Sequence, residues 1–208
     1  MKLLRVGLFG NEKPAALDKL GKIRDLSRYL DDFNSSTLNF ETLERLKKIN
    51  LESLPEVSSA SRIGSCIAKP GKFLAVGLNY SDHAIETNAK IPKEPIIFNK
   101  AANSMIGPND NIILPKLSRK LDWEVEIAFV VGKNTKYVSE DDAPNHILGY
   151  CIVNDISERE WQKERGGTWD KGKSGDTFGP TGPYLVTHDE IENVQNLSMS
   201  LDIDGKRM

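Results

Sequence analysis

The segment "DWEVEIAFVVG", residues 122–132, places two carboxylates at the start of an apolar run. Residues 125–131 carry apolar side chains on both faces, a pattern typical of a buried strand. Side chains two apart in a strand share a face, so Glu124 and Glu126 lie about 6 to 7 Å apart at Cβ. Like charges this close beside a buried segment repel one another and lose hydration. The sequence therefore predicts that something offsets this cost.

A third carboxylate, Asp155, follows the apolar run of "GYCIVNDISEREWQ". In one interpretation Asp155 caps the helix that follows, Glu158 or Glu160 adds charge to its first turn, and the two earlier glutamates lie on a solvated strand edge. In the other, all three carboxylates surround one divalent cation at the ends of two buried strands. Ligands that are all oxygen select a hard ion, so we expect Mg²⁺, with Mn²⁺ or Ca²⁺ as alternatives.

Two polar residues follow Asp155 at helical spacing. Arg159 and Gln162 stand at i+4 and i+7, so we expect them to share the face on which Asp155 lies. A cation site, a guanidinium and an amide on one wall favour a small anionic substrate, most simply a carboxylate.

The stretch "GLNYSDHAIE" contains a candidate general base. Asn79 or Ser81 can cap a short helix on which His83 and Glu86 are i, i+3 neighbours. A carboxylate beside an imidazole holds its tautomer and raises its basicity, as activation of water requires. The alternative is a surface helix turn with an incidental ion pair.

The segment "GTWDKGKS", residues 167–174, matches the phosphate-loop pattern G-x-x-x-x-G-K-[ST]. That pattern needs a buried strand before the loop and a helix after it. Here a charged helix is expected before it, and "GDTFGPTGP", which cannot be helical, follows. A nucleotide-binding protein is therefore disfavoured. What remains is Lys173, whose ammonium can reach an anionic centre.

The elements that must position these residues fall into two parts that divide near residue 68. Residues 3–9 predict a strand, residues 15–30 a short amphipathic helix and residues 39–54 a surface helix. The segment "PEVSSASRIG" is typical of a linker. From residue 69 onward, short apolar runs separated by Gly, Pro and Asn predict a β-rich domain with a few helices, an α+β fold.

Composition excludes several classes of protein. The 208 residues contain 28 Lys and Arg against 30 Asp and Glu, so the net charge is −2. This balance gives no general attraction to nucleic acid or to an anionic membrane. No apolar stretch approaches the roughly 20 residues of a membrane span, and the N-terminus lacks a signal-peptide pattern. The two cysteines have no metal or redox spacing, so we expect a cytoplasmic location.

The chain resembles the fumarylacetoacetate hydrolase family from about residue 69 onward. The resemblance rests on "KFLAVGLNYSDHAIE", "EPIIFNKAANSMIGPNDNIILP", "DWEVEIAFVVGKNTKYVSEDDA", "GYCIVNDISEREWQ" and "KGKSGDTFGPTGPYLVT". The N-terminal part resembles the subgroup labelled ureidoglycolate lyase or 2,4-diketo-3-deoxy-sugar-acid hydrolase. The resemblance implies a β-rich roll with a small N-terminal α/β domain, commonly a homodimer. It also implies that Glu124, Glu126 and Asp155 are the metal ligands.

The remaining roles follow from the same resemblance. His83 and Glu86 resemble the pair that activates water, Lys173 matches the lysine that stabilises a developing enolate, and Arg159 and Gln162 match positions that face the substrate. The chain ends at "LSMSLDIDGKRM", before the family's Thr-Gly-Thr-Pro segment, so we expect the C-terminal part of the fold to be missing. Asp204 and Gly205 predict a hairpin turn near this end.

These residues together predict hydrolytic cleavage of a C–C bond in a 2,4-diketo acid, with a metal-stabilised enolate. The same enolate serves an oxaloacetate-type decarboxylase or a 2-hydroxy-dienedioate isomerase, so these stay open. C–N cleavage by a ureidoglycolate lyase ranks lower, because it needs no enolate-stabilising site. A P-loop nucleotide binder and a structural protein without catalysis are the alternatives of other classes.

Overall fold

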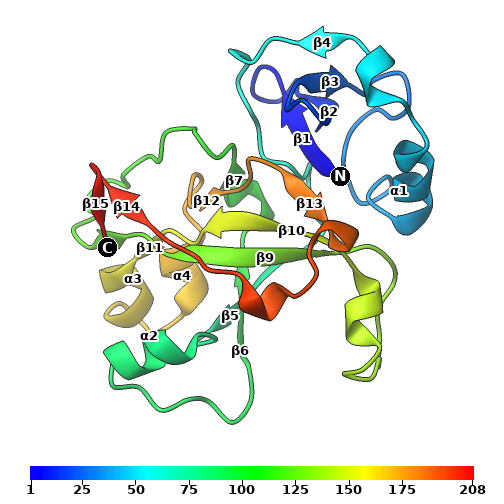
Figure 1. Ribbon diagram of the computed structural model, residues 1–208. Helices are drawn as coiled ribbons and strands as arrows, with labels where there is room; N and C mark the ends of the chain where they lie inside the picture. The colour runs from blue at the N-terminus through cyan, green and yellow to red at the C-terminus, as the bar shows by residue number, and fades with distance from the viewer.

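The computed structural model describes residues 1–208, and its centre is a seven-stranded sheet in which every paired strand is antiparallel. Strands from the two ends of the chain meet in it, because β1 pairs with β13 (Figure 1). The strands, in sheet order, are β4 (Glu56–Val57), β3 (Ile23–Asp25), β2 (Lys13–Leu17), β1 (Lys2–Val6), β13 (Leu185–Thr187), β10 (Ile147–Asn154) and β9 (Val125–Val131).

The strand predicted over residues 3–9 is confirmed as β1 up to Val6, but the helix predicted over residues 15–30 is wrong. The segment forms the hairpin of β2 and β3 instead. Gly21, with φ of +74°, lies in the turn, and the Asp18 carboxylate accepts hydrogen bonds from Leu20 N and Lys22 N. These turn contacts, together with pairing to β1, outweigh the weak helical periodicity of the segment.

The surface helix predicted over residues 39–54 is confirmed only in its first half. Helix α1 (Phe40–Lys47) begins at Asn39, whose side chain accepts from Thr42 N. Leu43 and Leu46 bury its apolar face in the main core. A separate 3-10 turn, η1 (Leu51–Ser53), follows because Asn50 caps it by accepting from Glu52 N.

The predicted linker is anchored along its length. Its first residues form β4, Gly7 N donates to Arg62 O, and Gly64 N donates to Arg5 O. The sheet and the main hydrophobic core both run across residue 68, and Cys66 packs in the same core cluster as Cys151. The division of the chain at residue 68 stays a prediction.

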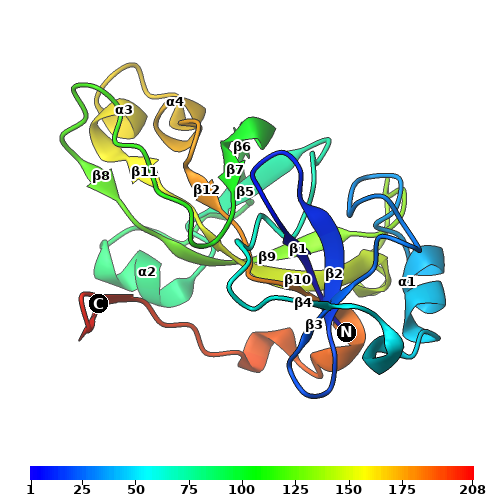
Figure 2. The same cartoon turned by 90° about the horizontal axis from the view of Figure 1, so that it is seen from above.

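A second layer lies beyond the β9 edge and carries most of the remaining helices (Figure 2). Its short helices α3 and α4 lie side by side in both views (Figure 1, Figure 2). Its helices are α2 (Ser81–Glu86), α3 (Arg159–Lys163) and α4 (Trp169–Lys173). The strand pairs outside the large sheet are β5 (Phe73–Gly77) with β6 (Ile96–Lys100), β7 (Met105–Ile106) with β12 (Gly179–Pro180), β8 (Leu121–Asp122) with β11 (Ser157–Glu158), and β14 (Asp202–Ile203) with β15 (Lys206–Arg207).

The turn predicted at Asp204 and Gly205 is confirmed. Both residues have positive φ, 51° and 80°, and they join β14 to β15. The other 3-10 turns are η2 (Ala102–Ser104), η3 (Ala143–His146), η4 (His188–Glu190) and η5 (Val194–Asn196). No helix in the structure has the length and apolar character that crossing a membrane would need.

Candidate active site

Antiparallel pairing of β9 and β10 brings the three predicted carboxylates together. Glu126 lies opposite Val153, and Val125 lies opposite Asn154, so the next pair along the register is Glu124 and Asp155. Asp155 N donates to Glu124 O over 2.8 Å, which continues the ladder past the end of β10. Opposite residues share a face, so the carboxylates of Glu124, Glu126 and Asp155 converge on one side of the sheet.

The bounds predicted for β9 are confirmed, but its burial is not. β9 is the edge strand of the sheet, and none of its residues is fully buried. Phe129 is 58% exposed and Val131 48% exposed. A run of apolar residues therefore does not by itself require cover on both faces, since apolar side chains also stand at open edges.

Burial and mutual repulsion act differently on the three carboxylates. Burial and the Glu124 carboxylate raise the pKa of Glu126 to about 7, although the Tyr80 hydroxyl partly offsets this rise. Burial would raise the pKa of Asp155 too, but the neighbouring ammonium groups of Lys100 and Lys173 outweigh it and hold that pKa below its ordinary value. Glu126, which has no ion-pair partner, therefore carries most of the electrostatic cost of the cluster.

Two buried lysines supply part of the positive charge of the site. Lys173 Nζ lies 2.5 Å from Glu124 Oε2 and 2.7 Å from Asp155 Oδ2, so it bridges two of the predicted metal ligands. Lys100 Nζ lies 2.6 Å from Asp155 Oδ1 and donates to the carbonyl oxygen of Lys173. Only 1% of Lys100 and 2% of Lys173 is exposed. Burial lowers the pKa of Lys100, although Asp155 opposes the effect.

Arg159 and Gln162 reach the cluster by a route that differs from the predicted one. Asp155 is not on the helix and does not cap it, so the shared helical face was wrong. Glu158 is the N-cap of α3, and its carboxylate accepts from Trp161 N over 2.7 Å. Because α3 begins next to the end of β10, Arg159 still lies 2.7 Å from Glu124 Oε1 and donates to Gln162 Oε1.

The segment that matches a phosphate loop has a packing role. Trp169–Lys173 is helix α4, and α3 rather than a buried strand precedes it. A Cβ on Gly172 would lie 2.6 Å from Gln162 N and Glu158 O, so this glycine lets α4 approach α3 closely. Trp169 covers Gly77 and packs edge-on against Phe98. These contacts place Lys173, at the end of α4, beside the carboxylates.

His83 and Glu86 lie on α2, where both are exposed. Neither predicted cap is used: the helix begins after Tyr80 and has no capping side chain. No hydrogen bond joins His83 to Glu86. Tyr80 connects α2 to the cluster, because its hydroxyl accepts from Ile127 N over 3.2 Å, next to Glu126. The role of the His83 and Glu86 pair stays a prediction.

The donor set fits a hard divalent cation in its chemistry, but the present arrangement is not closed around one. Three carboxylates on one face are the ligands such an ion prefers. Asp155 Oδ1 is buried and accepts no hydrogen bond, although it is ion-paired with Lys100. In the described structure no group of three or more His, Cys, Asp or Glu residues is poised to hold a metal. Lys173 lies between two of the three ligands instead.

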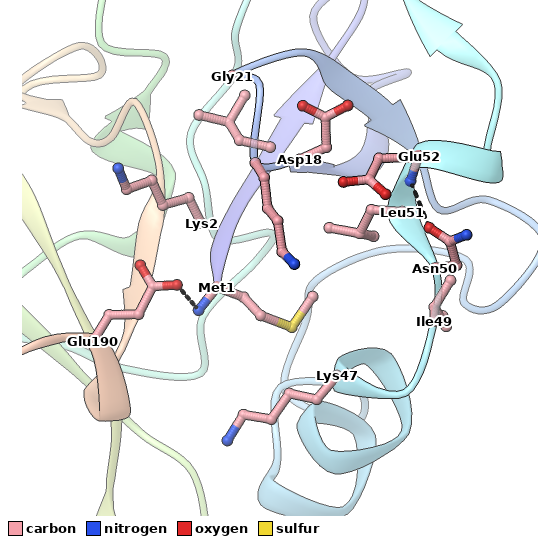
Figure 3. Close-up of a pocket in the computed structure, with 12 residues that line it drawn as sticks. Met1, Lys2, Asp18, Gly21, Lys47, Ile49, Asn50, Leu51, Glu52 and Glu190 are labelled. Atoms are coloured by element: carbon pink, nitrogen blue, oxygen red, sulfur yellow. Dashed lines mark hydrogen bonds and ion pairs between the residues drawn. The ribbon is translucent and has the colours of Figure 1, made fainter.

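A surface cleft lies away from the carboxylate cluster. It has a volume of about 600 Å³ and opens between the β2–β3 turn, the end of α1 and the N-terminus (Figure 3). Several of its charges are paired within the chain: the Met1 amine with Glu190 over 2.5 Å, and Asp18 with Arg24 over 2.7 Å. No residue of the carboxylate cluster lines it, and we assign no chemistry to it.

Sequence reasoning missed three residues of the site. Lys100 ends the apolar run "IIFNK", and its burial is the unexpected feature. Asp122 stands two residues before Glu124 and pairs with Arg159 over 2.7 Å. The alternation of Asp122, Glu124 and Glu126 was a signal that could have identified it. Tyr80 stands in the quoted "GLNYSDHAIE" and lacked any local signal.

Comparisons with known proteins agree with this architecture. The pattern of the fumarylacetoacetate (FAA) hydrolase C-terminal domain matches residues 72–208. A Burkholderia orbicola protein with a provisional hydrolase name is 53% identical over 207 residues, covering 100% of this chain and 73% of that protein.

Two solved structures are also similar. A Mycobacterium smegmatis protein provisionally called HpcE superposes with a TM-score of 0.85 at 29% identity, covering 100% of this chain and 74% of that one. The 5-carboxymethyl-2-hydroxymuconate delta-isomerase of the same organism gives a TM-score of 0.67 at 30% identity, covering 90% of this chain and 66% of that one. From the carboxylate cluster, the β-rich fold and these matches, the chain belongs to the fumarylacetoacetate hydrolase family.

Proposed function

We propose that this protein is a divalent-metal-dependent hydrolase that cleaves a C–C bond of a 2,4-diketo acid to give pyruvate and a second acid. The observation that carries the proposal is the convergence of Glu124, Glu126 and Asp155 with Lys173 and Arg159. A cluster of this composition has enough negative charge for a hard cation and enough positive charge for an anionic substrate. Family membership supports enzymatic activity on this scaffold.

Glu124, Glu126 and Asp155 would hold the cation, which we expect to be Mg²⁺ or Mn²⁺. When bound, the ion supplies a Lewis acid for the carboxylate and 2-oxo group of an α-keto acid. The raised pKa of Glu126 supports this assignment. Burial and repulsion destabilise the ionised form of this carboxyl group, so a nearby cation would stabilise it strongly. The lowered pKa of Asp155 would keep this carboxylate ionised at neutral pH.

Arg159 and Gln162 would orient the substrate. The Arg159 guanidinium is held by Asp122 and Glu124, and it donates to Gln162 Oε1 over 3.2 Å, so its plane is set before substrate arrives. Preorganised donors of this kind bind a carboxylate without reorganisation at the moment of reaction. The Lys173 ammonium would stabilise the developing enolate oxygen.

His83 would take the proton of the attacking water, with Glu86 supporting it. Water adds to the 4-oxo carbon, the bond between C3 and C4 breaks, and its electron pair stays on the three-carbon fragment as the enolate, which is then protonated at C3. Both side chains are exposed on α2, so they are free to rotate toward a substrate bound beside Tyr80 and Glu126. Catalytic hydrogen bonds often tighten only when substrate binds.

Isomerisation of a 2-hydroxy-dienoic diacid is the second candidate. It is favoured by the likeness to an isomerase at 30% identity. It needs the enolate-stabilising groups but no attacking water, so it would use Lys173 and Arg159 and would not depend on water activation by His83. A homodimer and a cytoplasmic location remain predictions.

The proposal is tested by titrating Mg²⁺ or Mn²⁺ while following thermal unfolding, because a ligand that binds only the native state raises the melting temperature. A panel of diketo-sugar acids, oxaloacetate and 2-hydroxy-dienoic diacids, with pyruvate detection, then assigns the reaction. Stabilisation by either ion and release of pyruvate from a 2,4-diketo acid are expected. No metal response, or stabilisation by ATP instead, would contradict the proposal.

A further inference from the structure

Lys173 occupies the position that a cation between Glu124 and Asp155 would take. Its ammonium lies 2.5 Å from Glu124 Oε2 and 2.7 Å from Asp155 Oδ2, and its side chain is 3% exposed. A divalent ion that used both carboxylates would need the same oxygen atoms. Two cations that close repel one another strongly in a poorly hydrated site, so both cannot bind these oxygens together.

We propose that Lys173 is an internal counter-cation that neutralises Glu124 and Asp155 in the metal-free protein and is displaced when a divalent ion binds. This inference rests on the proposed function, because it presupposes a metal at these carboxylates. It explains why an ammonium lies between two of the carboxylates that converge on one face.

The backbone around Lys173 is held in place, so displacement would involve its side chain alone. Lys100 donates to the Lys173 carbonyl oxygen, and Ala101 N donates to the Ser174 hydroxyl over 2.9 Å, so the last residue of β6 and the residue after it hold the end of α4 at two points. Lys100 also retains Asp155 Oδ1, which leaves Oδ2 as the oxygen that Lys173 would release. The Phe98 ring centroid lies 5.2 Å from Lys173 Nζ, so an aromatic face already borders the ammonium in its paired position.

Displacement links the metal to the substrate. While Lys173 is paired with Glu124 and Asp155, these carboxylates neutralise its charge, and the ammonium is not available to a substrate. Once a divalent ion replaces it, the ammonium is free to pair with an anionic group of the substrate. Lys173 can therefore stabilise the enolate only in the metal-loaded protein.

Calorimetric titration of chelator-treated protein with Mn²⁺ tests the inference. Lys173→Met removes the competing ammonium and keeps a long side chain, so we expect Mn²⁺ to bind about tenfold tighter or more, a factor equivalent to the loss of one modest ion pair. The metal-free variant should melt at a lower temperature than the wild type, because two carboxylates lose their counter-cation. Lys171→Met is the matched control, since Lys171 lies on the same helix but is exposed and bonds only to Arg165 O.

The outcomes separate this inference from the proposed function. Tighter binding by Lys173→Met alone supports displacement. If the wild type binds Mn²⁺ and Lys173→Met binds it no more tightly, the inference is overturned but the metal site is not. An equal increase in affinity in Lys171→Met has the same consequence. Absence of Mn²⁺ binding to every form overturns the proposed function itself.

A crystal of the wild-type protein soaked in Mn²⁺ gives a second measurement that does not depend on a variant that folds. Anomalous scattering would locate the ion, and we expect Lys173 Nζ to have left hydrogen-bond distance of Glu124 and Asp155. An ion bound by these carboxylates with Lys173 still bridging them would refute displacement.

Discussion

Glu126 should make the metal-free protein less stable as the pH rises from about 4.5 to about 7. Burial and repulsion by Glu124 raise the pKa of this carboxyl from the ordinary 4.5 to about 7 in the folded protein. Within that range the native state binds more protons than the unfolded state, and stability therefore falls as the pH rises. At about 1.4 kcal/mol for each pH unit of difference, the loss is at most about 3 kcal/mol.

Glu126→Gln removes this titration. The variant should match the wild type at pH 4.5 and exceed it by up to about 3 kcal/mol at pH 8, which corresponds to roughly 6 to 12 °C in melting temperature for a chain of this size. Thermal and urea unfolding in excess chelator, repeated at pH intervals, measure the difference. Glu140→Gln, which removes an exposed carboxylate, is the control.

Parallel pH profiles for the wild type and Glu126→Gln in chelator would refute this reasoning, because the carboxyl would then not titrate abnormally. With Mg²⁺ or Mn²⁺ present the order should reverse above pH 7. The wild type gains metal binding there, and a neutral amide is a poorer ligand for a hard cation.

Three further predictions concern the site. Glu124→Gln should reduce the Mg²⁺-dependent rise in melting temperature, and an unchanged rise in both this variant and Glu126→Gln would contradict the assignment of ligands. His83→Ala should lower hydrolysis by roughly 10² to 10⁴, the usual contribution of a general base, while oxaloacetate decarboxylation largely survives; Glu86→Gln should lose less. Equal losses of both reactions, measured by steady-state kinetics, would mean that the pair maintains the site instead of activating water. Gly172→Ala should destabilise the protein by about 2 kcal/mol or more, because its methyl group would overlap the backbone of α3, and an unfolding curve like that of the wild type would contradict the packing role of this glycine.

The sequence by itself determined the elements that carry the carboxylates. Alternation, apolar runs and turn residues are local signals, and they located β9 and the Asp204–Gly205 turn. They also placed Asp155 at the end of a strand. Once β9 and β10 pair as neighbours in antiparallel register, Glu124 and Asp155 must meet, so the cluster follows from local patterns plus one pairing.

Local signals failed where a helix and a hairpin have similar intrinsic free energies. Residues 15–30 have an apolar periodicity that fits a short helix, but Gly21 favours a turn and β1 offers a partner for a strand. An isolated helix of this length is marginal in water, so tertiary pairing decided the outcome. The same reasoning applies to β9. The burial of its apolar side chains depends on which segments pack against the strand, and the sequence of the strand alone does not determine that.

Only the tertiary structure decided how the charges are paired. Lys100 lies 55 residues before Asp155 in the chain, and Lys173 lies 18 residues after it, yet both reach the same carboxylate. Nothing near Lys100 marks it as buried, because lysine is ordinarily exposed and becomes buried only when a partner from elsewhere compensates its charge. Ion pairs depend on distances of a few ångströms between distant segments, so they follow from the assembled fold and not from any single segment.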